Sequence, residues 1–267
     1  MLLLDGCKKE ILLHLDDMKK IVPIVFLLIA LSLSASAEEI TVAAAADLQF
    51  ALKDVAARFE QQSGNKVNLI FGSSGNFFSQ IQNGAPFDVF FSADLDYPKQ
   101  LEAASLAEPN TLYQYATGKI VLWVRNDSKL DLSKGLAALL DPSINKIAIA
   151  NPAHAPYGRA AKAALEHEKL SEKLKDKFVL GENVSQTAQF VESGSAEAGI
   201  IALSLAIAPA MKEKGRYVEV PTSFYPPLQQ GCIVLKSSKK KAVALAFVEF
   251  LKEPEIVDLL RTSGFGK

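Results

Sequence analysis

ITVAAAADLQFALKDVAARFEQQSGNKVNLIFGSSGNFFSQIQNGAPFDVFF, residues 40–91, alternates between two patterns of hydrophobic residues. The runs 40–44, 67–71 and 88–91 are short and apolar, which is typical of buried strands. Helical spacing between the first two runs is kept by Leu48, Leu52, Val55 and Phe59. A second helical stretch begins after the glycine-rich turn at 72–75 and stops at Asn83-Gly84. Strands that alternate with helices in this way indicate sheets covered by helices, the α/β class.

The same alternation continues to the end of the chain. Further strands are expected at 120–124, 146–150, 178–180, 198–203, 217–220 and 232–235. Further helices are expected at 160–169, 187–193, 203–214, 239–252 and 255–262. About nine strands are many for one doubly wound sheet, which favours two lobes, each with a mainly parallel sheet. Periodicity alone does not locate the boundary between the lobes.

Composition excludes several classes of protein. The 267 residues carry 29 Lys and Arg against 30 Asp and Glu, a formal net charge of -1. Nucleic-acid binding and attachment to an anionic membrane surface both need a clear excess of positive charge, so no nucleic-acid partner is expected. With 49% hydrophobic residues the chain has ample material for a folded core.

The N-terminal region has the pattern of an export signal. Met18 precedes two lysines, an apolar stretch at 21–33 and the sequence Ser-Ala-Ser-Ala that ends at Ala37. This pattern predicts a secretory signal peptide over 18–37, cleaved after Ala37, and a periplasmic protein. No cysteine follows the apolar stretch, so a lipid anchor is not expected. Residues 1–17 mix acids and bases ahead of the signal, and we interpret them as a non-native upstream extension.

Four junctions between predicted strands and helices are rich in small residues. They are Ala45-Ala46-Asp47, Gly72-Ser73-Ser74-Gly75, Ala155-Pro156-Tyr157-Gly158 and Asn183-Val184-Ser185. Free N–H groups at helix N-termini, with hydroxyls beside them, suit an anion bound beyond the carboxyl ends of the strands. The alternative interpretation is that Asp47, Ser73 and Ser185 are ordinary helix caps and the glycines ordinary turns.

Motifs of common enzyme classes are missing from the sequence. It has no Walker A loop, no Gly-x-Ser-x-Gly elbow, no His-Glu-x-x-His and no Cys-x-x-Cys. His154 and His167 are the histidines beyond the signal, and neither accompanies a recognisable nucleophile. We therefore expect a binding protein without a cofactor, not an enzyme.

The chain resembles the periplasmic molybdate-binding proteins of ABC uptake systems, the ModA family, over essentially all of residues 38–267. The resemblance is carried by ITVAAAADL (40–48), GSSGNFFSQIQNGAPFDVFFSAD (72–94), NPAHAPYGRAA (151–161) and GENVSQTAQFVESGSAEAGIIAL (181–203). It implies two lobes joined by a hinge of crossing strands, with a tetrahedral oxyanion held in the cleft. The first lobe would be 38–118 plus 222–267 and the second 119–221.

The resemblance also implies which residues contact the anion. Ser74 matches the serine that donates its hydroxyl and backbone N–H, and Ser73 stands in the same loop. A second donor position of the first lobe falls on Asp47, with Ala46 beside it. In the second lobe Tyr157 and Val184 match donor positions. Molybdenum would enter only as molybdate, its oxygens held by the residues Ser74, Tyr157, Val184 and Asp47.

Two of these positions depart from the family pattern. Many members supply a tyrosine hydroxyl from the position of Ala202, which Tyr157 is expected to replace. An ionised Asp47 would repel a dianion that has only acceptors, so we expect its side chain to turn away and cap the following helix. Alternatively, Asp47 accepts the proton of hydrogen phosphate, and the ligand is phosphate or another tetrahedral oxyanion.

A ferric-ion-binding protein of the same fold is a further alternative, because Tyr157, His154 and Asp47 lie near candidate junctions, although a second tyrosine there is missing. The uptake interpretation implies a monomer that delivers molybdate or tungstate to a membrane permease with its ATPase. Nothing in the sequence separates molybdate from tungstate, which have nearly the same size and charge.

Overall fold

The computed structural model describes residues 37–266, and the chain from Glu38 onward forms one compact unit. The upstream extension (1–17) and all but the last residue of the expected signal peptide (18–37) lie outside the described residues. In the part that is described, no helix is both long enough and apolar enough to span a membrane.

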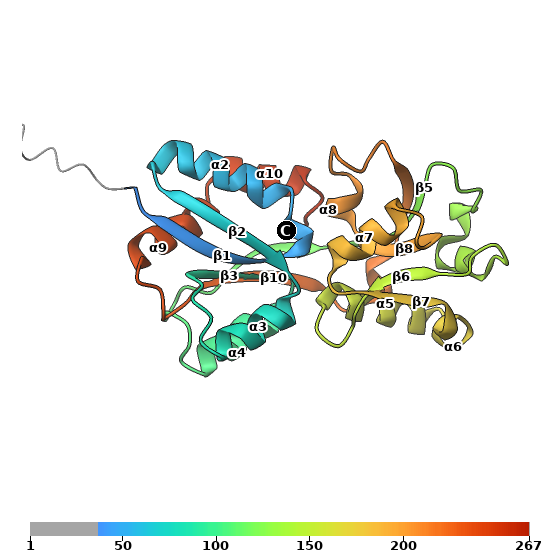
Figure 1. Ribbon diagram of the computed structural model, residues 1–267, viewed down its shortest axis with the longest axis horizontal. Coiled ribbons are helices and arrows are strands. Elements are labelled where there is room, and N and C mark those ends of the chain that lie inside the picture. The colour runs from blue at the N-terminus through green and yellow to red at the C-terminus, as the bar shows by residue number, and fades with distance from the viewer. Residues whose placement is uncertain (1–36, 267) are drawn as a thin grey trace, which may run out of the picture. The chain divides into compact units, whose positions relative to one another are not determined.

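Two five-stranded sheets organise this unit (Figure 1). The first has the order β2-β1-β3-β10-β4. Its strands are β1 (Glu39–Ala45), β2 (Lys66–Gly72), β3 (Val89–Ser92), β4 (Tyr113–Gly118) and β10 (Leu228–Val234). The second sheet has the order β7-β6-β8-β5-β9. Its strands are β5 (Ile120–Arg125), β6 (Ile147–Ala150), β7 (Phe178–Gly181), β8 (Ala198–Ala202) and β9 (Gly215–Glu219).

Helices cover both faces of the first sheet. They are α2 (Ala51–Ser63), α3 (Ser74–Gln82), α4 (Asp96–Ala103), α9 (Lys241–Phe250) and α10 (Pro254–Thr262). One face packs against α2, α9 and α10 in a hydrophobic cluster that contains Phe59 and Phe247. The other face packs against α3 and α4 around Phe77, Phe90 and Leu101, so that the sheet lies between the two sets of helices (Figure 1).

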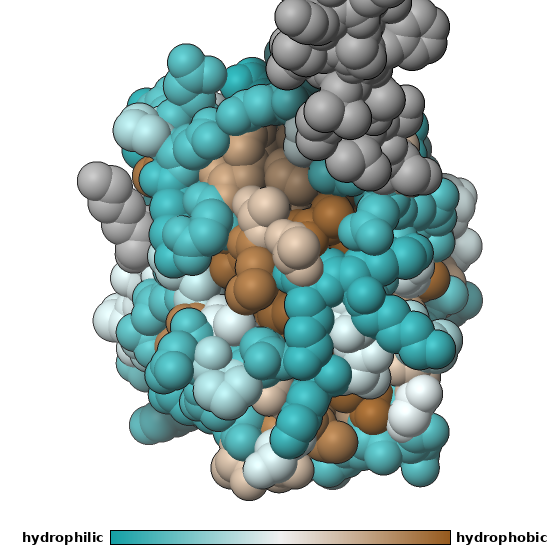
Figure 2. Space-filling view, turned by 90° about the vertical axis from the view of Figure 1, so that its left-hand side faces the viewer, coloured by the Kyte–Doolittle hydropathy of each residue, from teal (hydrophilic) through white to brown (hydrophobic). Residues whose placement is uncertain are grey.

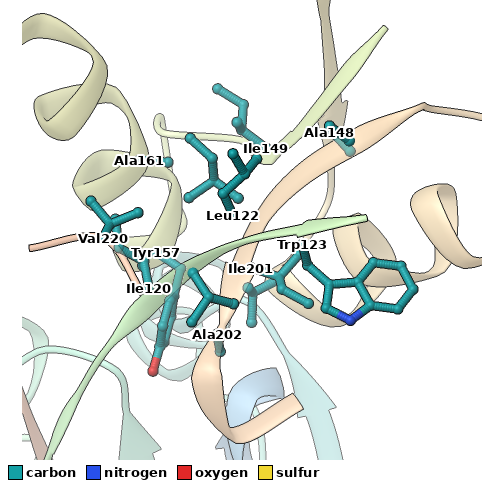
Figure 3. Close-up of a cluster of buried hydrophobic side chains, with 14 of the residues drawn as sticks. Ile120, Leu122, Trp123, Ala148, Ile149, Tyr157, Ala161, Ile201, Ala202 and Val220 are labelled. Carbon is teal, nitrogen blue, oxygen red and sulfur yellow. The ribbon is translucent and has the colours of Figure 1, made fainter. Parts of the chain in front are cut away.

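The second sheet has its own helices and a larger core. The helices are α5 (Pro156–His167), α6 (Ser171–Leu174), α7 (Val184–Glu192) and α8 (Leu203–Ala206). Short 3-10 helices occur at η1 (Ala46–Leu48), η2 (Leu132–Leu140), η3 (Lys175–Lys177) and η4 (Thr222–Phe224). Figure 3 shows the centre of this core, where side chains of β5, β6 and β8 pack against the inner face of α5.

The outer end of the first lobe, where α9 lies, is mostly hydrophilic. Hydrophobic side chains gather near the middle of this face, with smaller groups toward its lower edge, among hydrophilic ones (Figure 2).

The predicted α/β fold with two lobes is confirmed, and each sheet is mixed. In the first sheet β1 is parallel to β2 and β3, whereas β10 is antiparallel to β3 and β4. The second sheet repeats this arrangement, with β5 antiparallel to β8 and β9. The antiparallel pairs follow from the path of the chain, which leaves the first sheet between β4 and β5 and returns between β9 and β10.

The predicted helix at 203–214 is wrong beyond its first turn. α8 ends at Ala206, three residues before Pro209. A proline in a helix interior lacks the N–H that would bond to the preceding turn and clashes with its carbonyl, which ends the helix here. The strand β4 was not expected, because its sequence YQYATG has no continuous apolar run.

Candidate functional site

The four predicted junctions meet around one small cavity. Its lining comes from η1, from the N-termini of α3, α5 and α7, and from the end of β3, and therefore from both lobes. The lining residues are Ala45, Ala46, Asp47, Gly72, Ser73, Ser74, Ala93, Ala155, Pro156, Tyr157, Asn183 and Val184. The cavity has a free volume of about 10 Å³, roughly the space that the centre of one water molecule needs. The two lobes are therefore closed tightly around it.

Backbone N–H groups are the main polar groups that these junctions supply. The first N–H groups of a helix have no acceptor within the helix. In α7 the Asn183 side chain accepts from the N–H groups of Ser185 and Gln186, both at 3.0 Å, and Val184, the first residue of the helix, lines the cavity. No lysine or arginine is among the residues that line the cavity, so any positive partial charge that faces an anion there comes from helix ends.

Ser74 keeps a hydroxyl proton that it can donate. Its Oγ accepts a hydrogen bond from the backbone N–H of Ala93 at 2.9 Å. A serine hydroxyl has one proton and two lone pairs, so this bond fixes the position of Oγ and uses only a lone pair. Ser74 is buried and is the first residue of α3, which adds its backbone N–H.

The Ser73 hydroxyl is engaged elsewhere. It donates to the backbone carbonyl of His154 at 2.6 Å, and the His154 Nδ1 lies 2.9 Å from the same Oγ. Because the hydroxyl proton goes to the carbonyl, Nδ1 must be the donor of the second bond. In this geometry the Ser73 hydroxyl proton is therefore not free for an anion, and the serine joins α3 to the loop before α5.

Asp47 lies at the centre of a buried network that joins the lobes. Its Oδ2 accepts from the Tyr157 hydroxyl at 3.0 Å and from Gln230 Nε2 at 2.7 Å. Gln230 also donates to the Tyr157 oxygen at 3.0 Å, and its Oε1 accepts from the Tyr115 hydroxyl at 2.8 Å. The side chain of Asp47 is only 1% exposed. Its other oxygen, Oδ1, is buried and has no hydrogen-bond partner.

Burial controls the acid–base properties of this network. Desolvation raises the pKa of Asp47 to about 6, although the bonds from Gln230 and Tyr157 act in the opposite direction. Desolvation, with the nearby Asp47 charge, also raises the pKa of Tyr157 and of Tyr115 well above the usual value. Both tyrosines therefore remain neutral donors, and Asp47 is the group that can titrate near neutrality.

Two expectations about these side chains are wrong. Asp47 caps no helix, because η1 is preceded by Ala45 and α2 by Phe50, neither with a side-chain cap. Instead, one oxygen of the carboxylate accepts hydrogen bonds from Tyr157 and Gln230. The Tyr157 hydroxyl donates its proton to Asp47, and so it does not replace the hydroxyl expected from the position of Ala202. Figure 3 shows the Tyr157 oxygen pointing out of the second-lobe core toward the first lobe.

Sequence reasoning missed Gln230 and Tyr115. Gln230 is fully buried in β10, 183 residues along the chain from Asp47. A polar residue inside the apolar strand LQQGCIV was the available signal, because a buried amide needs partners. Gly118 at the end of β4 makes room for the contact, since a Cβ there would lie 2.4 Å from the Tyr157 oxygen and 2.6 Å from Gln230 Nε2.

The family model described as bacterial extracellular solute-binding protein matches residues 40–266. This chain belongs to that family. A curated member from Azotobacter vinelandii, "Molybdate-binding protein ModA", is 39% identical over 88% of this chain and 93% of its own length. A second with the same name, from Rhodobacter capsulatus, is 38% identical over 90% of this chain and 92% of its own length.

A solved structure agrees with these relatives. The Azotobacter vinelandii periplasmic molybdate-binding protein superimposes with a TM-score of 0.81 and 34% identity, and the match covers 85% of this chain and 99% of that one. Within the family this chain therefore stands with the molybdate-binding proteins, as the four sequence motifs predicted.

Proposed function

We propose that this chain is the solute-binding protein of an ABC uptake system and that it captures molybdate or tungstate in the cavity between its lobes. The observation that carries the proposal is the convergence of η1, α3, α5 and α7 on one cavity that no cationic side chain lines. Its relatives, named for molybdate binding, match along nearly their whole length.

The proposed contacts are backbone N–H groups at Ala46, Asp47, Ser74, Tyr157 and Val184, with the Ser74 hydroxyl. About six donors to a charged acceptor at ~1.5 kcal/mol each contribute ~9 kcal/mol, and ~8 kcal/mol corresponds to micromolar affinity. Closure and ordering of the lobes cost part of this free energy. Helix ends and the exclusion of water offset that cost. Selection between anions would come mainly from size, because the smaller sulfate leaves donors unsatisfied.

Closure needs two lobes that move about their connections. We place the first lobe at 38–118 plus 222–267 and the second at 119–221, because β1 to β4 and β10 share one sheet and β5 to β9 the other. Lys119, between β4 and β5, would be part of the hinge. The protein would act as a monomer in the periplasm after cleavage of the signal at Ala37, and pass the anion to a permease with its ATPase.

The alternatives are weaker for specific reasons. Among the described residues, no group of three His, Cys, Asp or Glu side chains could hold a metal ion, and His154 bonds to Ser73, away from the Asp47 network. Phosphate is favoured by one feature, the unpartnered Asp47 Oδ1, which could accept the proton of hydrogen phosphate. It is opposed by the molybdate-binding relatives.

Calorimetric titration tests the proposal. The protein, stripped of ligand, is titrated in turn with molybdate, tungstate, sulfate and phosphate. We expect tight one-to-one binding of molybdate and tungstate and no heat with sulfate. Binding of phosphate alone would identify a different nutrient, and silence with all four anions would reject the proposed function while leaving the fold.

A further inference from the structure

One carboxylate oxygen of a residue that lines the cavity has no hydrogen-bond partner. Asp47 lines the cavity, and its Oδ2 has two donors, from Tyr157 and Gln230. Its Oδ1 is buried without a partner. Leaving a buried carboxylate oxygen unpartnered costs stability, so such an oxygen in a binding site points to a partner that arrives with the ligand.

An ionised Asp47 is the wrong partner for the proposed ligand. Molybdate and tungstate are dianions whose oxygens only accept hydrogen bonds. In a cavity shielded from water, a carboxylate charge beside such an anion would be repelled far more strongly than in bulk solvent. Turning the side chain away would break the bonds to Tyr157 and Gln230, which hold it in place.

We infer that Asp47 binds the oxyanion as a neutral carboxylic acid, with Oδ2 accepting from Tyr157 and Gln230 and Oδ1 donating its proton in a hydrogen bond to the anion. The inference rests on the proposed function. A proton is taken from solvent when the anion binds and returned when it leaves. Asp47 thus offers the anion a donor and no acceptor, which disfavours hydrogen phosphate because its hydroxyl would find no acceptor on Asp47.

The groups around Asp47 are consistent with a proton on it. Those that interact with the carboxyl are the backbone N–H groups of Asp47 and Leu48, the side chains of Tyr157 of α5 and Gln230 of β10 and, through its charge, Tyr115 of β4, and no cation is among them. Asp94 acts on Tyr115 but is paired with Arg159, and His154 bonds to Ser73.

Elements packed against η1 or bonded to Asp47 also carry ionisable groups that are not among those acting on the Asp47 carboxyl. The exposed or half-exposed ones are Lys53, Asp54, Arg58 and Glu60 of α2, Lys66 of β2, Arg159, Lys162, Glu166 and His167 of α5, and Glu192 of α7. The remaining one is the Cys232 thiol of β10, whose pKa burial raises, so that it stays neutral.

The consequence is a defined dependence of affinity on pH. Burial already raises the pKa of Asp47 to about 6, and a bound dianion raises it further. If only the protonated form binds, the apparent Kd grows by the factor 1 + 10^(pH − pKa), which is about 50-fold between pH 6 and pH 8 for a pKa of about 6. At pH 7 about 0.9 proton is taken up per anion bound.

Calorimetry on the unmodified protein measures both quantities. Molybdate is titrated at pH 6, 7 and 8, and at pH 7 in two buffers of different ionisation enthalpy, whose difference in heat gives the number of protons taken up. Asp47→Asn keeps the size and supplies a permanent donor, so its affinity should be independent of pH and exceed that of the unmodified protein at pH 8. Any protonation of the anion itself would appear equally in this variant.

Asp176→Asn is the matched control, because Asp176 is exposed on η3 and its variant should keep the pH profile of the unmodified protein. Molybdate binding with no proton uptake and equal affinity at pH 6 and 8 would overturn the inference and leave the proposed function standing. If Asp47→Asn loses molybdate binding and binds no more tightly than the unmodified protein at pH 8, the ionised form of Asp47 is needed. That result would also overturn the inference. Failure of molybdate and tungstate to bind the unmodified protein would reject the proposed function and the inference together.

Discussion

At the scale of single residues, two adjacent serines of the site have different hydrogen-bonding roles. Ser73 and Ser74 are adjacent, yet one hydroxyl donates to His154 and the other keeps its proton. The difference arises because Ser74 Oγ accepts from Ala93, a contact between residues 19 positions apart that no local pattern reveals.

Ser74→Ala should weaken molybdate binding by about 10- to 100-fold, because a hydrogen bond to a charged acceptor contributes ~1.5–3 kcal/mol. Calorimetric titration measures the change. Ser79→Ala is the matched control, since Ser79 lies on the same helix and bonds to the backbone carbonyl of Gly75. Equal affinities of the two variants would remove Ser74 from the site.

Asp47→Asn should also change the stability of the ligand-free protein. Because the pKa of Asp47 is raised from 3.8 to about 6, the folded state holds its proton more tightly than the unfolded state. The free energy of unfolding therefore falls as pH rises from about 4 to about 6, by ~3 kcal/mol for a two-unit shift, and then stays level. Urea unfolding at several pH values should show this fall in the unmodified protein relative to Asp47→Asn. Parallel profiles would mean that Asp47 ionises normally.

At the scale of helices and strands, sequence patterns succeeded where the apolar spacing was regular. The runs around β1, β2, β3 and β5 to β10 were all expected, as were the N-termini of α3, α5 and α7 near the cavity. The sequence patterns failed where tertiary contacts determine the local structure. β4 has no continuous apolar run and is held in the sheet by its pairing with β10. Asp47 caps no helix because it is buried and bonded to Gln230.

Asn183 links helix stability to the site, because its side chain caps α7 just before Val184. Asn183→Ala should lower the free energy of unfolding by ~1 kcal/mol and weaken molybdate binding, since the first turn of α7 loses its fixed position. Asp131→Ala removes a comparable cap from η2, whose residues are absent from the cavity lining. It should lower stability alone. Urea unfolding and calorimetry on both variants separate the effects, and unchanged binding in Asn183→Ala would show that the cap does not position the N–H of Val184.

At the scale of the whole molecule, the lobes meet through side chains placed around the cavity. Arg159 of α5 pairs with Asp94, which follows β3, and donates to the Tyr97 hydroxyl at 3.3 Å. Ser204 donates to the backbone carbonyl of Asp47 at 2.8 Å. The site and the closed arrangement are therefore parts of one set of contacts, none of which could be predicted from sequence because each joins residues more than 60 positions apart.

If these contacts hold the lobes closed around the ligand, removing one should speed release more than it slows capture. Arg159→Met keeps the apolar stem and removes the charge, leaving the Asp94 carboxylate, 14% exposed, without its partner. We expect molybdate to dissociate several-fold faster, equivalent to ~1 kcal/mol for a partly exposed pair, and the rate to depend less on salt. Stopped-flow displacement measures the rate.

Lys162→Met makes the same change on the same helix, where Lys162 pairs only with Glu166 within α5, and should leave release unchanged. Equal rates in the two variants would mean that the ion pair between the lobes does not contribute to closure.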